Sequence, residues 1–350
     1  LYLSRSDVES AGPSMGQVIT ALEEAFREKG QGRVEMPPKP GIHPGDGDNF
    51  IHAMPAYIPS LKSAGIKWVA GFPENYKRGL PYITGLVILN DVETGLPLAV
   101  MDCVWITGMR TGAATAVAAK YLARPEASVA GILGCGVQGR TNLLALNELF
   151  PLTSVRAYDI VPERTEAYAA EMSQQTGIAV EPVRQPRDAV TGCDIVVTAG
   201  PILKQPHATI KVDWLDKGAF ASPVDFDSYW HPDAFAQADA FAELLKWQDA
   251  HFVIEEGVPT LPKVTISESA VGLMLSSMTR LDEDARDTPA AGTSAVKTRA
   301  STPPKPPTSG RFAPHARRRG RGRVISTPRR SATSPVIPIV GVTLLVAAGA

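Results

Sequence analysis

Six residues near the middle of the chain limit its fold more than any other feature. Residues 134–139, Gly-Cys-Gly-Val-Gln-Gly, have the spacing G-x-G-x-x-G. An apolar run at 128–133 precedes them, a helical pattern at 138–150 follows, and Asp159 ends the next strand-like run, twenty residues past Gly139. In that setting Gly134 permits a tight turn, Gly136 lets the backbone approach a pyrophosphate, and Gly139 lets the helix pack on the strand.

This context predicts a dinucleotide site that includes Val137 and Gln138 at the start of the helix. Backbone N–H groups there would bind the phosphates, and Asp159 would bind the ribose hydroxyls of adenosine. A carboxylate repels a 2′-phosphate, so we expect NAD(H) in preference to NADP(H), although Arg164 offers a charge that a phosphate could use. A glycine-rich turn that binds no nucleotide is the alternative.

The pattern around the glycine turn predicts two domains. From residue 125 onward, strand-like runs at 128–133, 154–158, 194–198 and 218–222 alternate with helical patterns, which is typical of a parallel sheet with helical crossovers. Upstream lie an amphipathic helix at 14–29, strands at 65–69 and 83–89, a hairpin turn and an alanine-rich helix at 107–122. We expect an α/β protein with a doubly wound parallel sheet at 121–280 and an α+β domain at 1–120.

The last part of the chain differs in composition. Residues 289–350 hold 11 Lys and Arg and no acidic residue, while residues 1–288 hold 24 basic and 36 acidic residues. We predict a disordered tail at 281–350, because large apolar residues are too few to offset chain entropy. Its basic run at 317–323 fits either a misread coding end or a nonspecific polyanion tether, and we expect no nucleic-acid function.

Several other classes of protein are not expected. Three cysteines are too few and too scattered for a disulfide framework, which favours the cytoplasm. The first twelve residues lack the pattern of a signal peptide, and the apolar segment 336–350 is shorter than the roughly 20 residues that span a bilayer. His43 and His52 do not make a metal site without a third ligand, so we expect no metal.

Four segments make a family resemblance specific. They are GIKWVAGFPEN (65–75), RGLPYITGLVILNDVETGLPLAVMD (78–102), WITGMRTGAATAVAAKYLARP (105–125) and GILGCGVQGR (131–140). Together they resemble the ornithine cyclodeaminase/μ-crystallin family over about residues 1–275. The resemblance implies an N-terminal substrate and dimerisation domain joined to a Rossmann domain, and a homodimer. It also implies hydride exchange between a nicotinamide and the Cα of an amino or imino acid.

The resemblance also assigns roles to single residues. Lys67 would bind the substrate carboxylate and activate the reacting centre, and Arg110 would be shared by substrate and cofactor. Thr84 and Thr198 would contact the nicotinamide half of the cofactor. Asp225, in SPVDFDSYW, would be the catalytic acid/base at the carboxyl edge of the sheet. Solvated surface charges, for Lys67 and Arg110, and a turn-capping role, for Asp225, are the alternatives.

The chain departs from the family pattern in two loops. Where many relatives carry an arginine after a proline, Pro38 is followed by Lys39, which keeps the charge for a substrate carboxylate but not the bidentate fork. The segments PPKPGIHP, FIHAMPAY and DFDSYW are similar to members described as a subunit of tyramine oxidase. We therefore expect an amino-acid dehydrogenase, ketimine reductase or cyclodeaminase, with an NAD-binding accessory subunit of an amine oxidase as the alternative.

Overall fold

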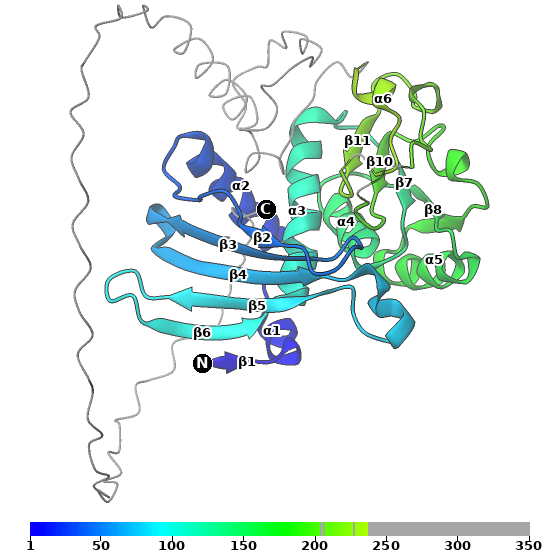
Figure 1. Cartoon of the computed structure of the whole chain (residues 1–350). Coiled ribbons are helices and arrows are strands. Elements are labelled where there is room, and N and C mark those ends of the chain that lie inside the picture. Colours follow the sequence, from blue (N-terminus) through cyan, green and yellow to red (C-terminus); the bar gives the residue numbers. More distant parts are fainter. Residues whose placement is uncertain (204, 206, 227, 237–350) are drawn as a thin grey trace, which may run out of the picture.

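The computed structural model in Figure 1 describes residues 1–203, 205, 207–226 and 228–236. The expected disordered tail at 281–350 lies outside these described residues, as does the apolar segment 336–350. Within the described part, the strands form one mixed sheet in the N-terminal half and one parallel sheet in the second half. No helix of this part is long and apolar enough to cross a bilayer.

The N-terminal sheet has six strands in the order β1-β6-β5-β4-β3-β2 among the described residues. All neighbours are antiparallel except β1 and β6. The strands are β1 (Tyr2–Leu3), β2 (Gly41–Ile42), β3 (Phe50–Ile58), β4 (Ser63–Gly71), β5 (Ile83–Asn90) and β6 (Pro97–Asp102). Short 3₁₀ turns, η1 (Pro59–Leu61) and η2 (Pro73–Arg78), connect β3 to β4 and β4 to β5.

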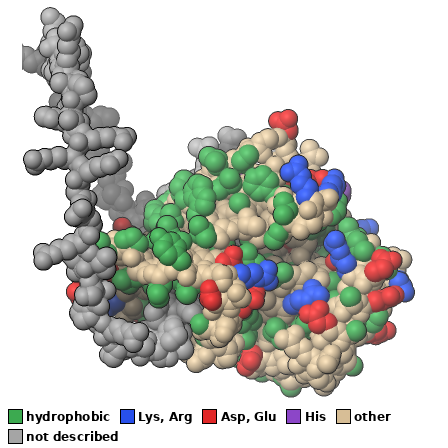
Figure 2. Space-filling view, turned by 90° about the horizontal axis from the view of Figure 1, so that it is seen from below, with side chains coloured by type: hydrophobic (Ala, Val, Ile, Leu, Met, Phe, Trp, Pro, Cys, Tyr) green, Lys and Arg blue, Asp and Glu red, His purple; other side chains and the backbone are tan. Residues whose placement is uncertain are grey.

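Three helices cover one face of this sheet: α1 (Arg5–Ala11), α2 (Met15–Gly30) and α3 (Val104–Leu122). Helix α2 begins where predicted because Ser14 and Gln17 form a reciprocal capping box. Its apolar side chains at Val18 and Leu22 pack on the alanine-rich α3. The opposite face of the sheet lacks such a cover in the described structure. Trp68 and Leu86 are each 47% exposed there, and Figure 2 shows hydrophobic side chains gathered on one side of the molecule.

The second sheet is parallel throughout, with the order β11-β10-β7-β8-β9. Its strands are β7 (Val129–Leu133), β8 (Ser154–Tyr158), β9 (Ala179–Pro182), β10 (Ile195–Thr198) and β11 (Phe220–Pro223). Its helices and 3₁₀ turns are α4 (Val137–Asn147), α5 (Pro162–Thr176), η3 (Pro186–Ala189), η4 (Val212–Trp214) and α6 (Pro232–Ala236). After β9 the chain returns to pair β10 with β7, which creates the switch point where doubly wound sheets bind ligands.

Helix α3 lies between the two sheets and contacts α4 closely. A Cβ atom at Gly112 would overlap the carbonyl oxygen of Thr141, so only glycine permits this crossing. The predicted boundary at residue 120 falls near the end of α3, and the one at residue 280 lies outside the described residues. The division into domains therefore stays a prediction, while the predicted α/β fold class is confirmed.

Candidate functional site

The glycine turn between β7 and α4 leaves room for a ligand. Gly134 has φ +106°, and a Cβ there would lie 2.6 Å from the carbonyl oxygen of Ala199 in the neighbouring strand connection. A Cβ at Gly139 would overlap the carbonyl oxygen of Gly134, whereas a Cβ at Gly136 would meet no heavy atom within 4 Å. Helix α4 then begins at Val137 with no side-chain cap. Its first N–H groups and the open space beside Gly136 fit a phosphate group.

Asp159 lies directly beside the glycine turn. It follows β8, and its Oδ2 accepts a hydrogen bond from the Cys135 N–H at 2.9 Å, while its Oδ1 accepts one from the Val161 N–H at 3.0 Å. Each carboxylate oxygen keeps lone-pair capacity for a further donor. The turn and the carboxylate therefore lie next to each other, and their predicted roles in binding a pyrophosphate and a ribose stay predictions. Arg164 is exposed and forms no ion pair with the described residues.

Asp225 is buried at the carboxyl edge of the same sheet, with 1% of its surface exposed. The Thr198 hydroxyl donates to its Oδ1 at 2.6 Å, and the Gly200 N–H donates to its Oδ2 at 2.8 Å. Trp230 in turn donates from Nε1 to the Thr198 oxygen at 2.8 Å. Thr198 therefore orients the aspartate in this structure, and its predicted contact with a nicotinamide stays a prediction.

The backbone around Asp225 is also tightly held. The Ser228 hydroxyl donates to the Asp225 carbonyl oxygen at 2.7 Å and accepts from the Leu203 N–H at 3.0 Å. Phe226 has φ +60°, a left-handed conformation that is unfavourable for a bulky residue and is often found at functional sites. Sequence reasoning missed Ser228 and Trp230, because nothing in the local sequence reports contacts with residues 25 to 32 positions earlier.

Two basic side chains, one buried and one partly buried, lie on the sheet side of the site. Lys67, on β4, is 2% exposed, and burial, with Arg110 and Lys39 nearby, holds its pKa well below the ordinary value. Burial also lowers the pKa of Arg110, on α3, to about 10. The Nε and Nη1 atoms of Arg110 are buried and have no hydrogen-bond partner in the described structure. Lys67 and Arg110 form no ion pair there either.

The group that lies beside both cations is a thiol. Cys103 immediately precedes α3 and is fully buried near Lys67 and Arg110. Burial raises the pKa of this thiol, so it stays neutral and supplies no counter-charge. The charged forms of two basic groups are unfavourable in a desolvated setting without an anion, and a ligand that carries a negative charge removes this cost. The arrangement therefore fits a carboxylate-bearing ligand. No local motif around Cys103 indicates this role.

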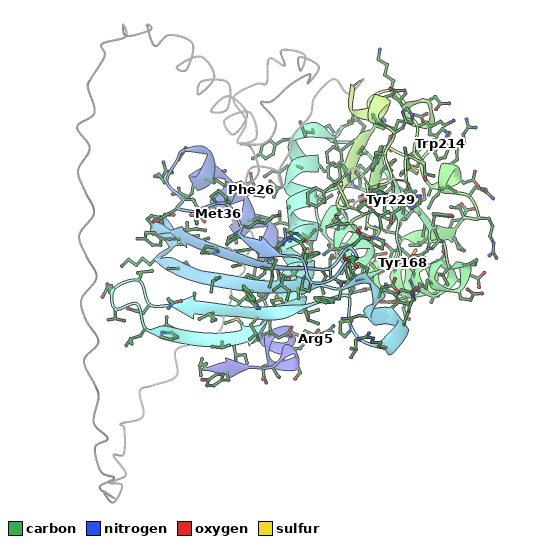
Figure 3. The ribbon with its side chains drawn as sticks, viewed as in Figure 1. Arg5, Phe26, Met36, Tyr168, Trp214 and Tyr229 are labelled. Atoms are coloured by element: carbon green, nitrogen blue, oxygen red, sulfur yellow. The ribbon has the colours of Figure 1, made fainter. Side chains whose placement is uncertain are left out.

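Two tyrosines meet at the junction of the two halves. Tyr229, seen in Figure 3, packs its ring on Gly200 and donates to the Pro201 carbonyl oxygen at 3.2 Å. Burial, together with nearby Asp225 and Tyr82, raises the pKa of Tyr229 to about 12. The Tyr82 hydroxyl lies near the backbone of Ile202 and makes no hydrogen bond of good geometry with the described residues. Neither tyrosine was predicted.

Thr84 does not join Lys67 in this structure. The β4–β5 register pairs Lys67 with Val87, and strand alternation places Thr84 on the opposite sheet face, together with Leu86. Its proposed cofactor contact stays a prediction. The rings of His43 and His52 lie 5.9 Å apart edge to face, and the described residues contain no group of three or more His, Cys, Asp and Glu side chains that could hold a metal ion.

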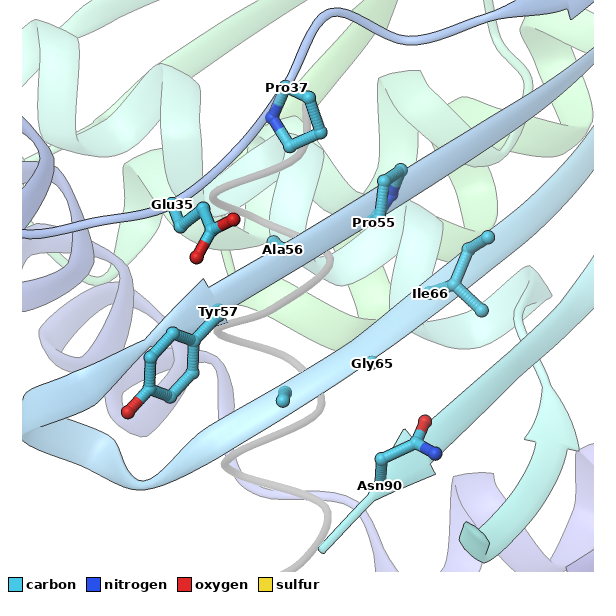
Figure 4. A pocket seen from close by; sticks show the side chains of 9 residues that line it. Glu35, Pro37, Pro55, Ala56, Tyr57, Gly65, Ile66 and Asn90 are labelled. Carbon is cyan, nitrogen blue, oxygen red and sulfur yellow. The ribbon is translucent and has the colours of Figure 1, made fainter. Parts of the chain in front are cut away.

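A separate hollow of about 340 Å³ lies on the uncovered face of the N-terminal sheet (Figure 4). Glu35, Tyr57, Ile66 and Asn90 are among its lining residues. The strand register places Tyr57, Ile66 and Asn90 on the face opposite to Lys67. The hollow is therefore distinct from the site formed by Lys67, Arg110 and Asp225.

Comparison with known proteins agrees with this geometry. The sequence profile of the ornithine cyclodeaminase/mu-crystallin family matches residues 1–255. The chain belongs to this family. It is 39% identical over 227 residues to the alanine dehydrogenase of Archaeoglobus fulgidus, covering 65% of this chain and 67% of that protein.

Two solved structures are also similar. One is Thermococcus litoralis Δ(1)-pyrroline-2-carboxylate reductase in complex with NADH and L-proline. It is 40% identical with a TM-score of 0.60, and the match covers 63% of this chain and 67% of that chain. The other is an archaeal alanine dehydrogenase dimer with bound NAD, 38% identical with a TM-score of 0.57, covering 63% of this chain and 66% of that chain.

Proposed function

We propose that the chain is an NAD(H)-dependent enzyme that exchanges a hydride with the Cα of a small amino or imino acid. One observation carries the proposal: Lys67 and the buried guanidinium atoms of Arg110 have no anion among the described residues, while Asp225 is held at the carboxyl edge of the cofactor sheet. The similar enzymes are an alanine dehydrogenase and a pyrroline-2-carboxylate reductase. Oxidation, reduction and redox-neutral cyclisation all use this step.

The residues that would hold the cofactor are those of the glycine turn and the strand ends. Gly134, Gly136, Val137, Gln138 and Gly139 would enclose the pyrophosphate. Asp159 would accept hydrogen bonds from the ribose hydroxyls, which favours NAD(H) over NADP(H), and Arg110 and Thr198 would contact the nicotinamide half. When bound, the nicotinamide supplies or accepts the hydride.

Lys67, Arg110 and Lys39 would bind the substrate carboxylate. The guanidinium fork of Arg110 offers two unpartnered N–H groups in a buried setting, where a charge-assisted pair is strong. Lys67 has a lowered pKa, so its amine can take up a proton when an anion binds, or relay one to a reacting nitrogen. Three basic side chains around one carboxylate would fix the orientation of Cα.

Asp225 would move the proton of the reaction. Its Oδ1 and Oδ2 are fixed by Thr198 and Gly200, so the carboxylate does not need to reorganise before it accepts a proton from the substrate amine. In the reductive direction the protonated acid would return that proton to the imine nitrogen. The Trp230 Nε1–H donates to the Thr198 oxygen and so supports this orientation.

We propose a homodimer formed through the uncovered face of the N-terminal sheet. Trp68 and Leu86 stand opposite each other in the β4–β5 register, each half exposed, and Leu98 on β6 is exposed to the same extent. A contiguous apolar patch of this kind is unusual on a monomer. The hollow at Tyr57 and Ile66 would accept side chains from the second copy.

We place the enzyme in the cytoplasm. The three cysteines Cys103, Cys135 and Cys193 are free and buried, which suits a reducing compartment. Small amino acids and their imines are water-soluble substrates that such a location supplies.

An accessory role is the second candidate function. The loops PPKPGIHP, FIHAMPAY and DFDSYW resemble those of members described as a subunit of tyramine oxidase. In that role the chain would bind NAD(H) and associate with an oxidase without turning over an amino acid alone. A chain that binds NAD(H), is inactive with every amino and imino acid, and co-purifies with an oxidase would favour this candidate.

A two-stage screen tests the proposed enzyme. Thermal shift with NAD(H) and NADP(H) identifies the cofactor, and nicotinamide absorbance then follows turnover of amino acids and cyclic imino acids. We expect stabilisation by NAD(H) first, and absorbance change with at least one imino acid. The absence of any cofactor-dependent stabilisation would contradict the proposal.

A further inference from the structure

A network of side chains holds the glycine turn on the side away from its open space. The Arg140 guanidinium donates from Nη1 to the carbonyl oxygens of Cys135 at 2.5 Å and Gly136 at 3.1 Å. Glu171, on α5, fixes the guanidinium by accepting from Nε at 2.9 Å and from Nη2 at 2.7 Å. Both carbonyl groups therefore accept hydrogen bonds from Nη1 of the same guanidinium.

Tyr168 completes this network from α5. Its side chain is fully buried (Figure 3), and its hydroxyl donates to the Gly139 carbonyl oxygen at 3.0 Å. The Arg140 guanidinium lies over the Tyr168 ring, 5.4 Å from the ring centroid. A cation at this distance from an aromatic ring is attracted to it. Arg140 is therefore held by an acid and by a ring, while it holds two carbonyl groups.

Peptide geometry sets the direction in which the N–H groups of the glycine turn point. In a planar trans peptide the C=O and N–H groups point in opposite directions. When Arg140 binds the carbonyls of Cys135 and Gly136, the N–H groups of Gly136 and Val137 must point away from Arg140. Asp159 fixes the preceding peptide through the Cys135 N–H. Three successive peptide planes therefore have set orientations before any ligand arrives.

We infer that Arg140, oriented by Glu171 and Tyr168, is a positioning residue that preorganises the N–H groups of the glycine turn for a pyrophosphate. The inference rests on the proposed function only in that it requires a dinucleotide ligand. We do not expect Arg140 to contact the ligand, because Nη1 binds the backbone carbonyls and Nε and Nη2 bind Glu171. Its effect is on the free energy of cofactor binding and not on the hydride step.

The test uses the full chain and two ligands, NADH and ADP-ribose, which carries the pyrophosphate without a nicotinamide. Arg140→Gln should weaken both ligands by about tenfold or more, as expected when a charge-assisted hydrogen bond to the loop is lost. The kcat at saturating NADH should change less than twofold. Arg184→Gln is the matched control. It removes an exposed ion pair with Glu166, which lies on α5 like Glu171, and this ion pair does not contact the glycine turn.

Two further variants separate geometry from charge and from folding. Arg140→Lys keeps the charge but cannot bind both carbonyls and Glu171 together, so it should resemble Arg140→Gln more than the parent chain. Tyr168→Phe keeps the ring and removes the bond to Gly139, so it should weaken ADP-ribose with a cooperative melt retained. Full recovery of affinity by Arg140→Lys, or unchanged affinity in Arg140→Gln, would overturn the inference. Failure of the parent chain to bind either ligand would instead overturn the proposed function.

Discussion

At the scale of single residues, Lys67 is the group whose environment departs most from the ordinary. Its amine is buried beside Arg110 with no anion in the described structure, so the cost of burial must be balanced elsewhere. Functional sites commonly retain such unfavourable groups, because removing them stabilises the fold and destroys activity. Lys67 is therefore the residue at which stability and function should respond in opposite directions.

We predict that Lys67→Met raises the melting temperature at neutral pH and lowers kcat/KM by about 10²-fold or more. Burial weakens the binding of a proton to this amine in the folded chain relative to the unfolded chain, so folding favours release of a proton. The destabilisation of the parent chain by the buried Lys67 amine therefore decreases as pH rises toward the ordinary lysine pKa of 10.5. The difference in melting temperature should then shrink from pH 7 to pH 10. A lower melting temperature for the variant, with no dependence on pH, would contradict this account.

We predict a different pattern for Asp225→Asn. The amide keeps the shape and can still accept the Thr198 bond, but it cannot take a proton from an amine. The kcat should fall by about 10²–10⁴, the usual contribution of a positioned acid/base. NADH affinity, measured by fluorescence titration, should stay within about twofold. Asp233→Asn, on exposed α6, is the control, and equal kcat values for the two variants would exclude Asp225 as the acid/base.

The residues that sequence could predict are those whose roles depend on short spacings. Gly134, Gly136 and Gly139 have roles set by the backbone over six positions, and Asp159 follows at a fixed strand and helix distance. The hydrogen-bond network around Asp225 could not be predicted. Trp230 donates to Thr198, the partner of Asp225, only once β10 and β11 have paired. Tyr82 and Cys103 carry no local pattern at all, since their importance comes from burial and from neighbours that are distant in the sequence.

At the scale of elements, the crossing of α3 and α4 connects the substrate side to the cofactor side. Gly112 is the contact point, where the α4 backbone at Thr141 leaves no room for a side chain. We predict that Gly112→Ala lowers the melting temperature, because backbone overlap outweighs the gain of about 1 kcal/mol in helix propensity. Gly16→Ala in α2 is the control, since its Cβ would meet only the mobile Glu148 side chain. Thermal melts in which both variants match the parent would show that the crossing is loosely packed.

The elements themselves were predicted well where the periodic pattern is long. The helix at 14–29 and the strand at 154–158 have the expected positions as α2 and β8. The helix expected at 138–150 ends earlier, at Asn147. The strands β1 and β9 were not predicted, because two to four residues carry too little periodicity and pair only after their neighbours are placed.

At the scale of the whole molecule, the uncovered face of the N-terminal sheet decides the assembly. We predict that Trp68→Glu, which places a charge in the middle of this face, converts the dimer to a monomer that still melts cooperatively. Light scattering after size-exclusion chromatography measures the mass. Leu149→Glu, on the surface after α4, is the control and should leave the dimer intact. A parent chain that is monomeric at micromolar concentration would contradict the proposed interface.

The proposed enzyme transfers a hydride between the nicotinamide and the Cα of an amino or imino acid. The most direct measurement incubates the full chain with NADH that carries deuterium at nicotinamide C4 and with a cyclic imino acid, and analyses the product by mass spectrometry and NMR. We predict one deuterium per product molecule, located at Cα, from one C4 epimer of the cofactor. Product without deuterium, or deuterium at another carbon, would contradict hydride transfer to Cα.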